Sequence, residues 1–170
     1  MLMPCSNYSN QPHRFKTMKK SLTLRPATLE DAEGIAELIR KSITVLCDLD
    51  HQHEPNQLAD WLSDINTARI AECIDENCIQ VLALLGKKRV GFAAMNWQGE
   101  IQFFYVAPKQ IGQGIGSALL AELELAAREH GLNPIMLATT HSARGFFRLR
   151  GFIPTRPDYA EWLEKPLQHH

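Results

Sequence analysis

The feature that most constrains this chain is a glycine-rich turn between a short apolar run and a long amphipathic stretch. The turn contains Gly112, Gly114 and Gly116; the run at 101–106 predicts a strand before it, and the stretch at 114–130 predicts a helix after it. Glycine lets the backbone approach a ligand closely, and the first turn of a helix carries unpaired N–H groups that favour phosphate. Spaced glycines also serve tight turns and close helix packing, so the turn alone leaves a purely structural role open.

Two well-known phosphate loops do not fit this turn. A P-loop requires a Gly-Lys-Ser/Thr sequence, which supplies a lysine to the phosphates and a hydroxyl group to magnesium, and the turn lacks it. A dinucleotide-binding Rossmann unit requires an acidic residue at the end of its second strand. The strand expected at 134–138 is followed by Thr139 and Thr140 instead. Dinucleotide binding is therefore not expected.

The rest of the hydrophobic pattern predicts mixed α/β structure. Apolar residues recur at helical spacing in some segments and at period two in others, with Gly or Pro between them. Because right-handed strand–helix–strand crossovers dominate, the strands at 101–106 and 135–138 are expected to be parallel. The expected elements are strands at 22–25, 79–85, 89–97, 101–106 and 134–138, helices at 28–46, 55–65, 114–130 and 142–150, and a last strand after Phe152.

Length and charge limit the classes of function. The chain has 170 residues, of which 45% are hydrophobic and 22% charged, as is typical of one globular domain. We expect this domain at 21–168, after a disordered or loosely attached tail at 1–20. A formal net charge of -1 gives no attraction to nucleic acid or an anionic membrane, and no apolar run is long enough to span a bilayer. Neither partner is expected, and the predicted location is the cytoplasm.

The cysteines and histidines form no recognisable metal site. The cysteines lack the paired spacing of a zinc ribbon or a disulfide framework, so we expect reduced thiols and no bound metal. A redox-active pair is the alternative for two of them. His51 and His53 lie in an acidic link at 48–54 and lack an identifiable third ligand. The cysteines are Cys5, Cys47 and the alternative pair, Cys73 and Cys78.

Four segments together resemble the GNAT superfamily of acyl-CoA N-acyltransferases. Residues 106–120 are similar to its strand, Arg/Gln-x-x-Gly-x-Gly/Ala turn and helix. Residues 24–27 with Asp31 resemble its opening, 106–108 its exit from the fourth strand, and 143–152 its closing Ala-x-x-Phe-Tyr-x-x-x-Gly-Phe. The resemblance implies a mixed, mostly antiparallel twisted sheet of about six or seven strands with about four helices, splayed between the fourth and fifth strands.

The resemblance also implies a reaction and a cofactor site. The reaction is direct aminolysis of acetyl-CoA by a primary amine, on a small molecule or on a protein lysine or N-terminus; a homodimer is left open. The backbone of Val106 would pair with the pantetheine arm, and backbone N–H groups of the turn would hold the pyrophosphate, with Ser117 as an added donor. The N–H groups are those of Gly112, Gln113, Gly114, Ile115 and Gly116.

The chain departs from the family pattern at cofactor-site positions. Ile111 replaces the usual Arg or Gln, which removes one side-chain contact but keeps the main-chain donors. Phe147 stands where many members carry the tyrosine thought to protonate the leaving thiolate, and Thr140 where asparagine is common. These departures motivate a second hypothesis, a regulatory domain that binds acyl-CoA without turnover. A structural interaction module is the third.

Candidate catalytic residues follow from the chemistry of aminolysis, which needs a neutral amine and a proton acceptor. Glu100 is the leading base and is similar to a glutamate of the histone acetyltransferase branch. Burial by Trp97 and Ile101 would raise its pKa. A solvated carboxylate in a hairpin turn is the alternative for Glu100. Tyr105 is a second candidate, and Ser142 or His141 lies near the missing tyrosine. The thiolate can also leave unaided, since a thiol pKa of about 8.5 makes it a tolerable leaving group.

Overall fold

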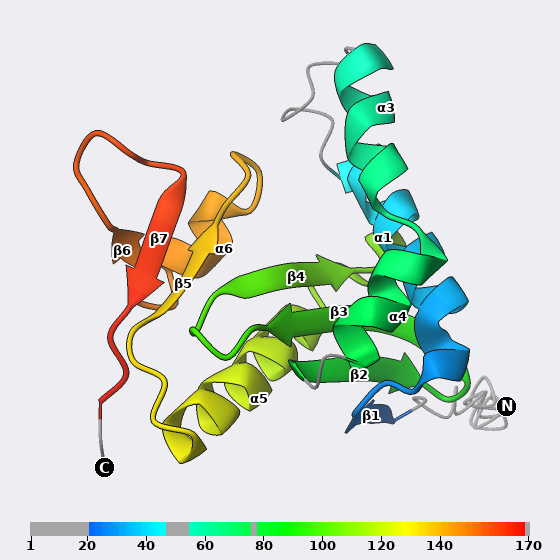
Figure 1. The fold of residues 1–170 in the computed structure, drawn as a ribbon, viewed down its shortest axis with the longest axis horizontal. Coiled ribbons are helices and arrows are strands. Elements are labelled where there is room, and N and C mark those ends of the chain that lie inside the picture. Colours follow the sequence, from blue (N-terminus) through cyan, green and yellow to red (C-terminus); the bar gives the residue numbers. More distant parts are fainter. Residues whose placement is uncertain (1–20, 47–54, 76–77, 169–170) are drawn as a thin grey trace, which may run out of the picture.

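The computed structural model describes residues 21–46, 55–75 and 78–168, which contain two sheets (Figure 1). The main sheet is antiparallel throughout, in the order β1-β2-β3-β4, and the small sheet is antiparallel in the order β5-β7-β6. The expected meander at 79–106 is confirmed. The strands are β1 (Leu22–Arg25), β2 (Ile79–Leu85), β3 (Lys88–Met95), β4 (Ile101–Val106), β5 (Ile135–Ala138), β6 (Ile153–Pro154) and β7 (Trp162–Lys165).

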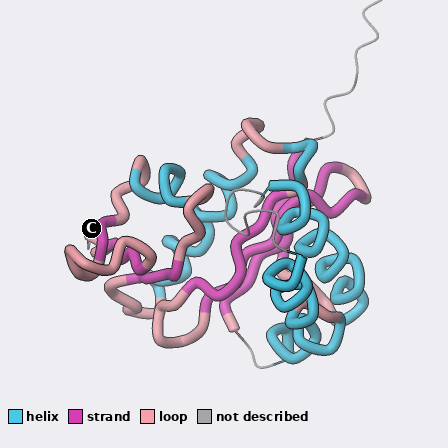
Figure 2. The backbone as a smooth tube through the Cα atoms, turned by 90° about the horizontal axis from the view of Figure 1, so that it is seen from above, coloured by secondary structure: helices cyan, strands magenta, loops and turns pink. Residues whose placement is uncertain are grey.

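Helices cover the main sheet, and a further helix accompanies the small one. The bounds are α1 (Ala32–Leu46), α3 (Pro55–Asp64), α4 (Thr67–Asp75), α5 (Ile115–Glu129) and α6 (Arg144–Arg148). Helix α1 contacts β3 and β4, and α5 contacts β2 and β3. Seen from above, α1, α3 and α4 cluster at one end of the molecule and the C-terminal part lies at the other (Figure 2).

Gly91 allows α5 to pack closely on the sheet. A Cβ atom at this position of β3 would lie 2.9 Å from side-chain atoms of both Ile115 and Leu119. Both residues are buried, together with Leu123 and Ala127 on the same face of α5. The glycine therefore brings the beginning of α5 against the centre of the sheet, where the glycine-rich turn ends.

The two sheets meet at a single parallel bridge between Glu100 and Met136. The Met136 N–H donates to the Gly99 carbonyl at 2.8 Å. Beyond this point β4 and β5 belong to different sheets. The expected parallel orientation is thus confirmed at one end only, and the splay implied by the family resemblance is observed between the fourth and fifth strands.

The structure corrects several expected elements. The second helix ends at Asp64 and is followed by α4, which the sequence interpretation missed; Asn66 accepts the Arg69 N–H at 2.9 Å and so begins that helix. The strand expected after Phe152 is β6, which has only two residues. The chain then forms a further strand, β7, which was not expected and which lies between β5 and β6 in the small sheet. Its four residues are too short for a clear period-two pattern. The first helix begins as a short 3-10 turn, η2 (Leu29–Asp31), before α1.

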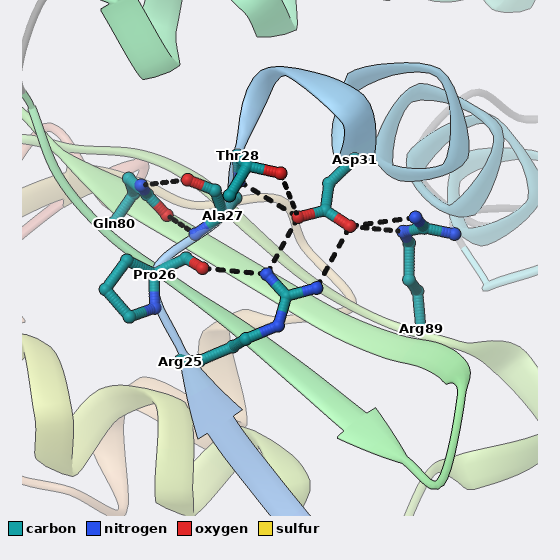
Figure 3. Close-up of polar contacts among 7 residues, drawn as sticks. All are labelled: Arg25, Pro26, Ala27, Thr28, Asp31, Gln80 and Arg89. Carbon is teal, nitrogen blue, oxygen red and sulfur yellow. Dashed lines mark hydrogen bonds and ion pairs between the residues drawn. The ribbon is translucent and has the colours of Figure 1, made fainter.

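Asp31 is a buried carboxylate held between two arginines (Figure 3). Arg25 donates to it at 2.8 and 3.1 Å from the end of β1, and Arg89 donates at 2.8 and 3.1 Å from β3. The Thr28 N–H donates to the same carboxylate at 2.9 Å. Thr28 is the N-cap of η2, and the Asp31 carboxylate caps this turn and joins it to β1 and β3.

The hydrogen bonds from Arg25 are the largest influence on the pKa of Asp31, and they act against the burial that would raise it. Together with the Thr28 N–H and Arg89 they hold the pKa of Asp31 well below its usual range. A carboxylate with a depressed pKa stabilises the fold above its unfolded pKa of about 3.9, and that stabilisation is lost as the pH falls below this value.

We predict that Asp31→Asn lowers the free energy of unfolding by about 3 kcal/mol at pH 7, because two arginines lose their buried partner. The difference from the unsubstituted chain narrows as the pH falls from about 4 towards 2. Urea unfolding at several pH values measures both effects. Glu37→Gln is the control, since its ion pair with Lys41 is exposed, and it changes stability by less than about 0.5 kcal/mol. A pH-independent cost of Asp31→Asn would contradict the prediction.

Candidate functional site

A cavity of about 450 Å³ opens where β4 and β5 diverge, a volume within the range of small-molecule sites. Its walls come from β4, the glycine-rich turn, the first turn of α5, the end of β5 and helix α6. Most candidate cofactor-site residues lie here. Those that line the cavity are Val106, Ile111, Gly112, Gly114, Ile115, Gly116, Ser117 and Phe147; Gln113 is exposed in the turn between lining residues.

The turn has the backbone geometry that its glycines allow. Gly112 and Gly114 adopt positive φ values of 79° and 83°, and Gly114 is the N-cap of α5. A Cβ at either position would have no neighbour within 4 Å, so the backbone faces open space. The next N–H groups, of Ile115 to Ser117, precede the first intrahelical donor, the Ala118 N–H, which donates to the Gly114 carbonyl at 3.1 Å. No acidic residue lies in this helical turn. Such an arrangement favours an anion.

The edge of β4 presents backbone groups to the same cavity. The Ala107 N–H donates to the Val90 carbonyl at 2.8 Å, and Val106 lies opposite Gly91. Because groups along an antiparallel strand point alternately to its two sides, those of Val106 and Phe104 point away from β3 and towards the opening. This edge can pair with an extended amide-containing ligand, as the pantetheine interpretation requires.

Ser42 reaches this edge from α1. Its hydroxyl donates to the Val106 carbonyl at 3.1 Å, and the side chain is buried yet lines the cavity. Ser42 was not singled out from the sequence, because a small hydroxyl side chain within a helix gives no functional signal by itself. The structure makes it a polar tie between α1 and the exit of β4.

Aromatic side chains form one wall. Phe147 is 2% exposed and contacts Phe104, Phe146 and Phe152, with ring centroids 5.1, 5.0 and 5.3 Å away. A Cβ at Gly116 would lie 3.1 Å from the Phe146 ring, so this wall packs directly on α5. Phe147 thus lies in the cavity wall, where its ring contacts other phenylalanine rings.

The structure separates the three catalytic candidates. Tyr105 and Ser142 line the cavity, and Ser142 Oγ lies 3.3 Å from Thr140 Oγ1. Glu100 is not among the lining residues; its carboxylate accepts from Asn96 Nδ2 at 3.3 Å at the end of the hairpin. Trp97, expected to bury this carboxylate, is 40% exposed and packs edge-on against His130.

Other residues named from the sequence lie partly outside the described ranges. This applies to the 1–20 tail, Cys47, the 48–54 link and the final histidines. Within the described ranges no cluster of three potential metal ligands occurs, and none of the helices there is long and apolar enough to cross a membrane. The Sγ atoms of Cys73 and Cys78 lie 3.1 Å apart.

A glycine turn at a helix N-terminus beside the open edge of a strand has a geometry that suits an extended phosphorylated ligand. Comparison with known proteins gives the family. Residues 49–162 match the family model described as an acetyltransferase (GNAT) domain. An aminoalkylphosphonate N-acetyltransferase from Salmonella typhimurium is 33% identical over 134 residues, which cover 74% of this chain and 79% of that protein. The chain therefore belongs to the GNAT acetyltransferase family and is an acyltransferase enzyme.

Solved structures agree with this assignment. A GCN5-related N-acetyltransferase from Rhodopseudomonas palustris superposes with a TM-score of 0.76 at 26% identity, covering 86% of this chain and 96% of that one. The PaiA N-acetyltransferase from Thermoplasma acidophilum, solved in complex with coenzyme A, has a TM-score of 0.75 at 19% identity, with coverages of 86% and 99%. Both similarities support the mixed α/β architecture expected from the sequence.

We predict that Ser42→Ala lowers the free energy of unfolding by about 1 to 2 kcal/mol, because the Val106 carbonyl loses its buried donor. Chemical denaturation measures the change. Ser63→Ala is the matched control: its hydroxyl donates to the Asp60 carbonyl on an exposed helix, where water replaces it. Equal effects of the two substitutions would show that the tie to β4 contributes nothing.

Proposed function

We propose that this enzyme transfers the acetyl group of acetyl-CoA to a primary amine of a small molecule. The observation that carries the proposal is the left-handed glycine turn at the beginning of α5, which opens into the same cavity as the free edge of β4. Acetyl-CoA has a pyrophosphate, two amide groups and a thioester in one extended line. The turn, the edge and the interior of the cavity offer complementary groups in the same order.

Each part of the cosubstrate has chain residues that fit it. The N–H groups of residues 112–116 and the Ser117 hydroxyl would hold the pyrophosphate. The backbone of Val106 would pair with the pantetheine arm, and the thioester would lie towards Tyr105. Open space above Gly112 and Gly114 supports this fit, because larger residues would fill the approach to the backbone. The PaiA acetyltransferase, which is similar in fold, was solved in complex with coenzyme A, and this supports a CoA-type cosubstrate.

A small-molecule acceptor is favoured over a protein. The curated relative of 33% identity acts on aminoalkylphosphonates. The cavity of about 450 Å³ is lined by α1, β4 and the end of β5 on the side away from the turn. A short amine with an anionic group is therefore the first acceptor class to test, and protein lysines or N-termini are the second.

Chemistry at the thioester requires two proton movements. The amine nitrogen bonds to the carbonyl carbon, the carbon–sulfur bond breaks, the amine loses a proton and the thiolate gains one. Phe147 has no proton to give. We propose that Tyr105 protonates the thiolate, with Ser142 as the alternative donor, and that the proton of the amine passes to water in the open cavity. Glu100, outside the cavity lining, can serve as base only through a chain of water.

The first experiment is calorimetric titration with acetyl-CoA, followed by a thiol-release assay with aminoalkylphosphonates, polyamines, amino acids and lysine peptides. We expect micromolar binding and release with a small amine. Gly114→Ala weakens binding at least tenfold, because its Cβ occupies the approach to the pyrophosphate. Gly131→Ala is the matched control: its φ is also positive, at 68°, and its Cβ is equally unobstructed, but it lies at the far end of α5.

Failure can take two forms here. No binding of acetyl-CoA by the unsubstituted chain would refute the proposed function. Binding without thiol release for any acceptor would instead support the regulatory interpretation, in which the departures at Ile111 and Phe147 mark lost turnover.

We predict that Tyr105→Phe lowers kcat about 10- to 100-fold and changes the KM for acetyl-CoA by less than threefold, because only the proton donor is removed. Glu100→Gln is measured in parallel and keeps kcat within about twofold. Steady-state kinetics across the pH range gives both results. A large loss for Glu100→Gln with little effect of Tyr105→Phe would reverse the assignment and identify Glu100 as a base acting through water.

A further inference from the structure

We infer that Arg150 binds the pyrophosphate of the acyl-CoA cosubstrate and supplies, from the end of α6, the side-chain contact that the glycine turn lost at Ile111. The inference rests on the proposed function. Ile111 stands where the family usually carries Arg or Gln, so the turn itself has no side-chain donor at this position. Ile111 is 55% exposed and lines the cavity, as does Arg150.

Arg150 is fixed at the first turn of α5. Its Nη2 atom donates to Ser117 Oγ at 2.7 Å, and its Nη1 atom donates to the Phe146 carbonyl at 2.9 Å. The guanidinium carbon lies 3.6 Å from the centroid of the Phe146 ring, so the plane of the cation rests on the aromatic wall. Phe146 in turn packs against the Gly116 position. The cation is therefore placed beside the anion-binding N–H groups before any ligand arrives.

The geometry leaves Arg150 with donors for a ligand. A guanidinium carries five N–H donors, and the two hydrogen bonds above use two of them. Ser117 Oγ accepts from Arg150, which directs the hydroxyl hydrogen elsewhere and leaves it able to donate. An anion at the beginning of α5 would thus meet main-chain N–H groups, the Ser117 hydroxyl and a positive charge together.

The charge around Arg150 favours an anion as its natural partner. Among the described residues that line the cavity, Arg150 is the only charged side chain. The described ion pairs of the chain lie elsewhere, at Asp31, Glu37 and Glu124. No carboxylate among these lining residues compensates the positive charge of Arg150, which lies next to the positive end of a helix dipole. A bound anion would compensate both.

The test compares cosubstrates with and without phosphate. Calorimetry with acetyl-CoA is expected to show about 10- to 30-fold weaker binding for Arg150→Ala, since a charge-assisted contact is worth about that factor. The KM for S-acetyl-N-acetylcysteamine, a thioester that has no phosphate, changes less than twofold. Arg148→Ala, which changes an exposed arginine at the end of α6 outside the cavity lining, is the control and leaves both values unchanged.

A second variant tests the replacement itself. Ile111→Arg in the Arg150→Ala background is expected to recover most of the lost affinity for acetyl-CoA, because it returns a cation to the position where the family carries Arg or Gln.

Dephospho-CoA, which lacks the 3′-phosphate, distinguishes a contact with the pyrophosphate from a contact with the 3′-phosphate. The loss caused by Arg150→Ala persists with dephospho-CoA if Arg150 contacts the pyrophosphate.

Three results would overturn the inference. Unchanged binding of acetyl-CoA by Arg150→Ala would remove any role in affinity. An equal loss for the phosphate-free thioester would show that Arg150 only shapes the cavity wall. Disappearance of the effect with dephospho-CoA would move the contact from the pyrophosphate to the 3′-phosphate. A failure of the unsubstituted chain to bind acetyl-CoA would refute the proposed function instead, so the two failures are distinguishable.

Discussion

The unpaired edge of β4 is the constraint on which the rest of this structure depends. The strand pairs with β3 on one side but meets β5 only at the bridge between Glu100 and Met136. Buried backbone N–H and C=O groups are costly without partners, so the opening has to be satisfied by a side chain or a ligand. Ser42 satisfies the Val106 carbonyl, and the edge that faces the cavity is left for an extended amide-bearing molecule.

Two different interactions with the main sheet hold the elements that build the cavity: the ion pairs of Asp31 and the close packing at Gly91. Asp31 and its two arginines join β1, α1 and β3, which fixes the helix that carries Ser42. Gly91 removes a side chain from β3 and lets Ile115 and Leu119 approach, which fixes the beginning of α5. A buried ionic contact and a missing methyl group thus position the hydroxyl and the N–H groups that face each other across the site.

The replacement of tyrosine by Phe147 changes how the proton chemistry is distributed. The Phe147 ring is packed among other phenylalanines and has no proton to donate. Polar groups that line the cavity lie instead on the strand, at Tyr105, and in the loop after β5, at Ser142. Under the proposed function, these hydroxyl groups in the same cavity would replace the proton donor that Phe147 cannot supply.

Much of the fold and half of the site could be predicted from the sequence. Long periodic segments such as α5 and the β2-β3-β4 meander were predicted nearly to their ends, because their burial patterns are local and repeated. The short strand β7 and the separate helix α4 were missed, since four residues show little periodicity and the cap at Asn66 was not recognised. The glycine turn was identified because positive φ values and close backbone approach demand a particular residue type.

The sequence by itself therefore determined the family, the glycine turn and the phenylalanine at 147, all of which depend on residue type and local spacing. Only the tertiary structure decided which side chains share the cavity. It placed Ser42 and Arg150 there and left Glu100 at the end of a hairpin. The physical reason is that these positions depend on the crossing of α1, the splay of β4 and the packing of α6 on α5, which are contacts between segments far apart in the chain.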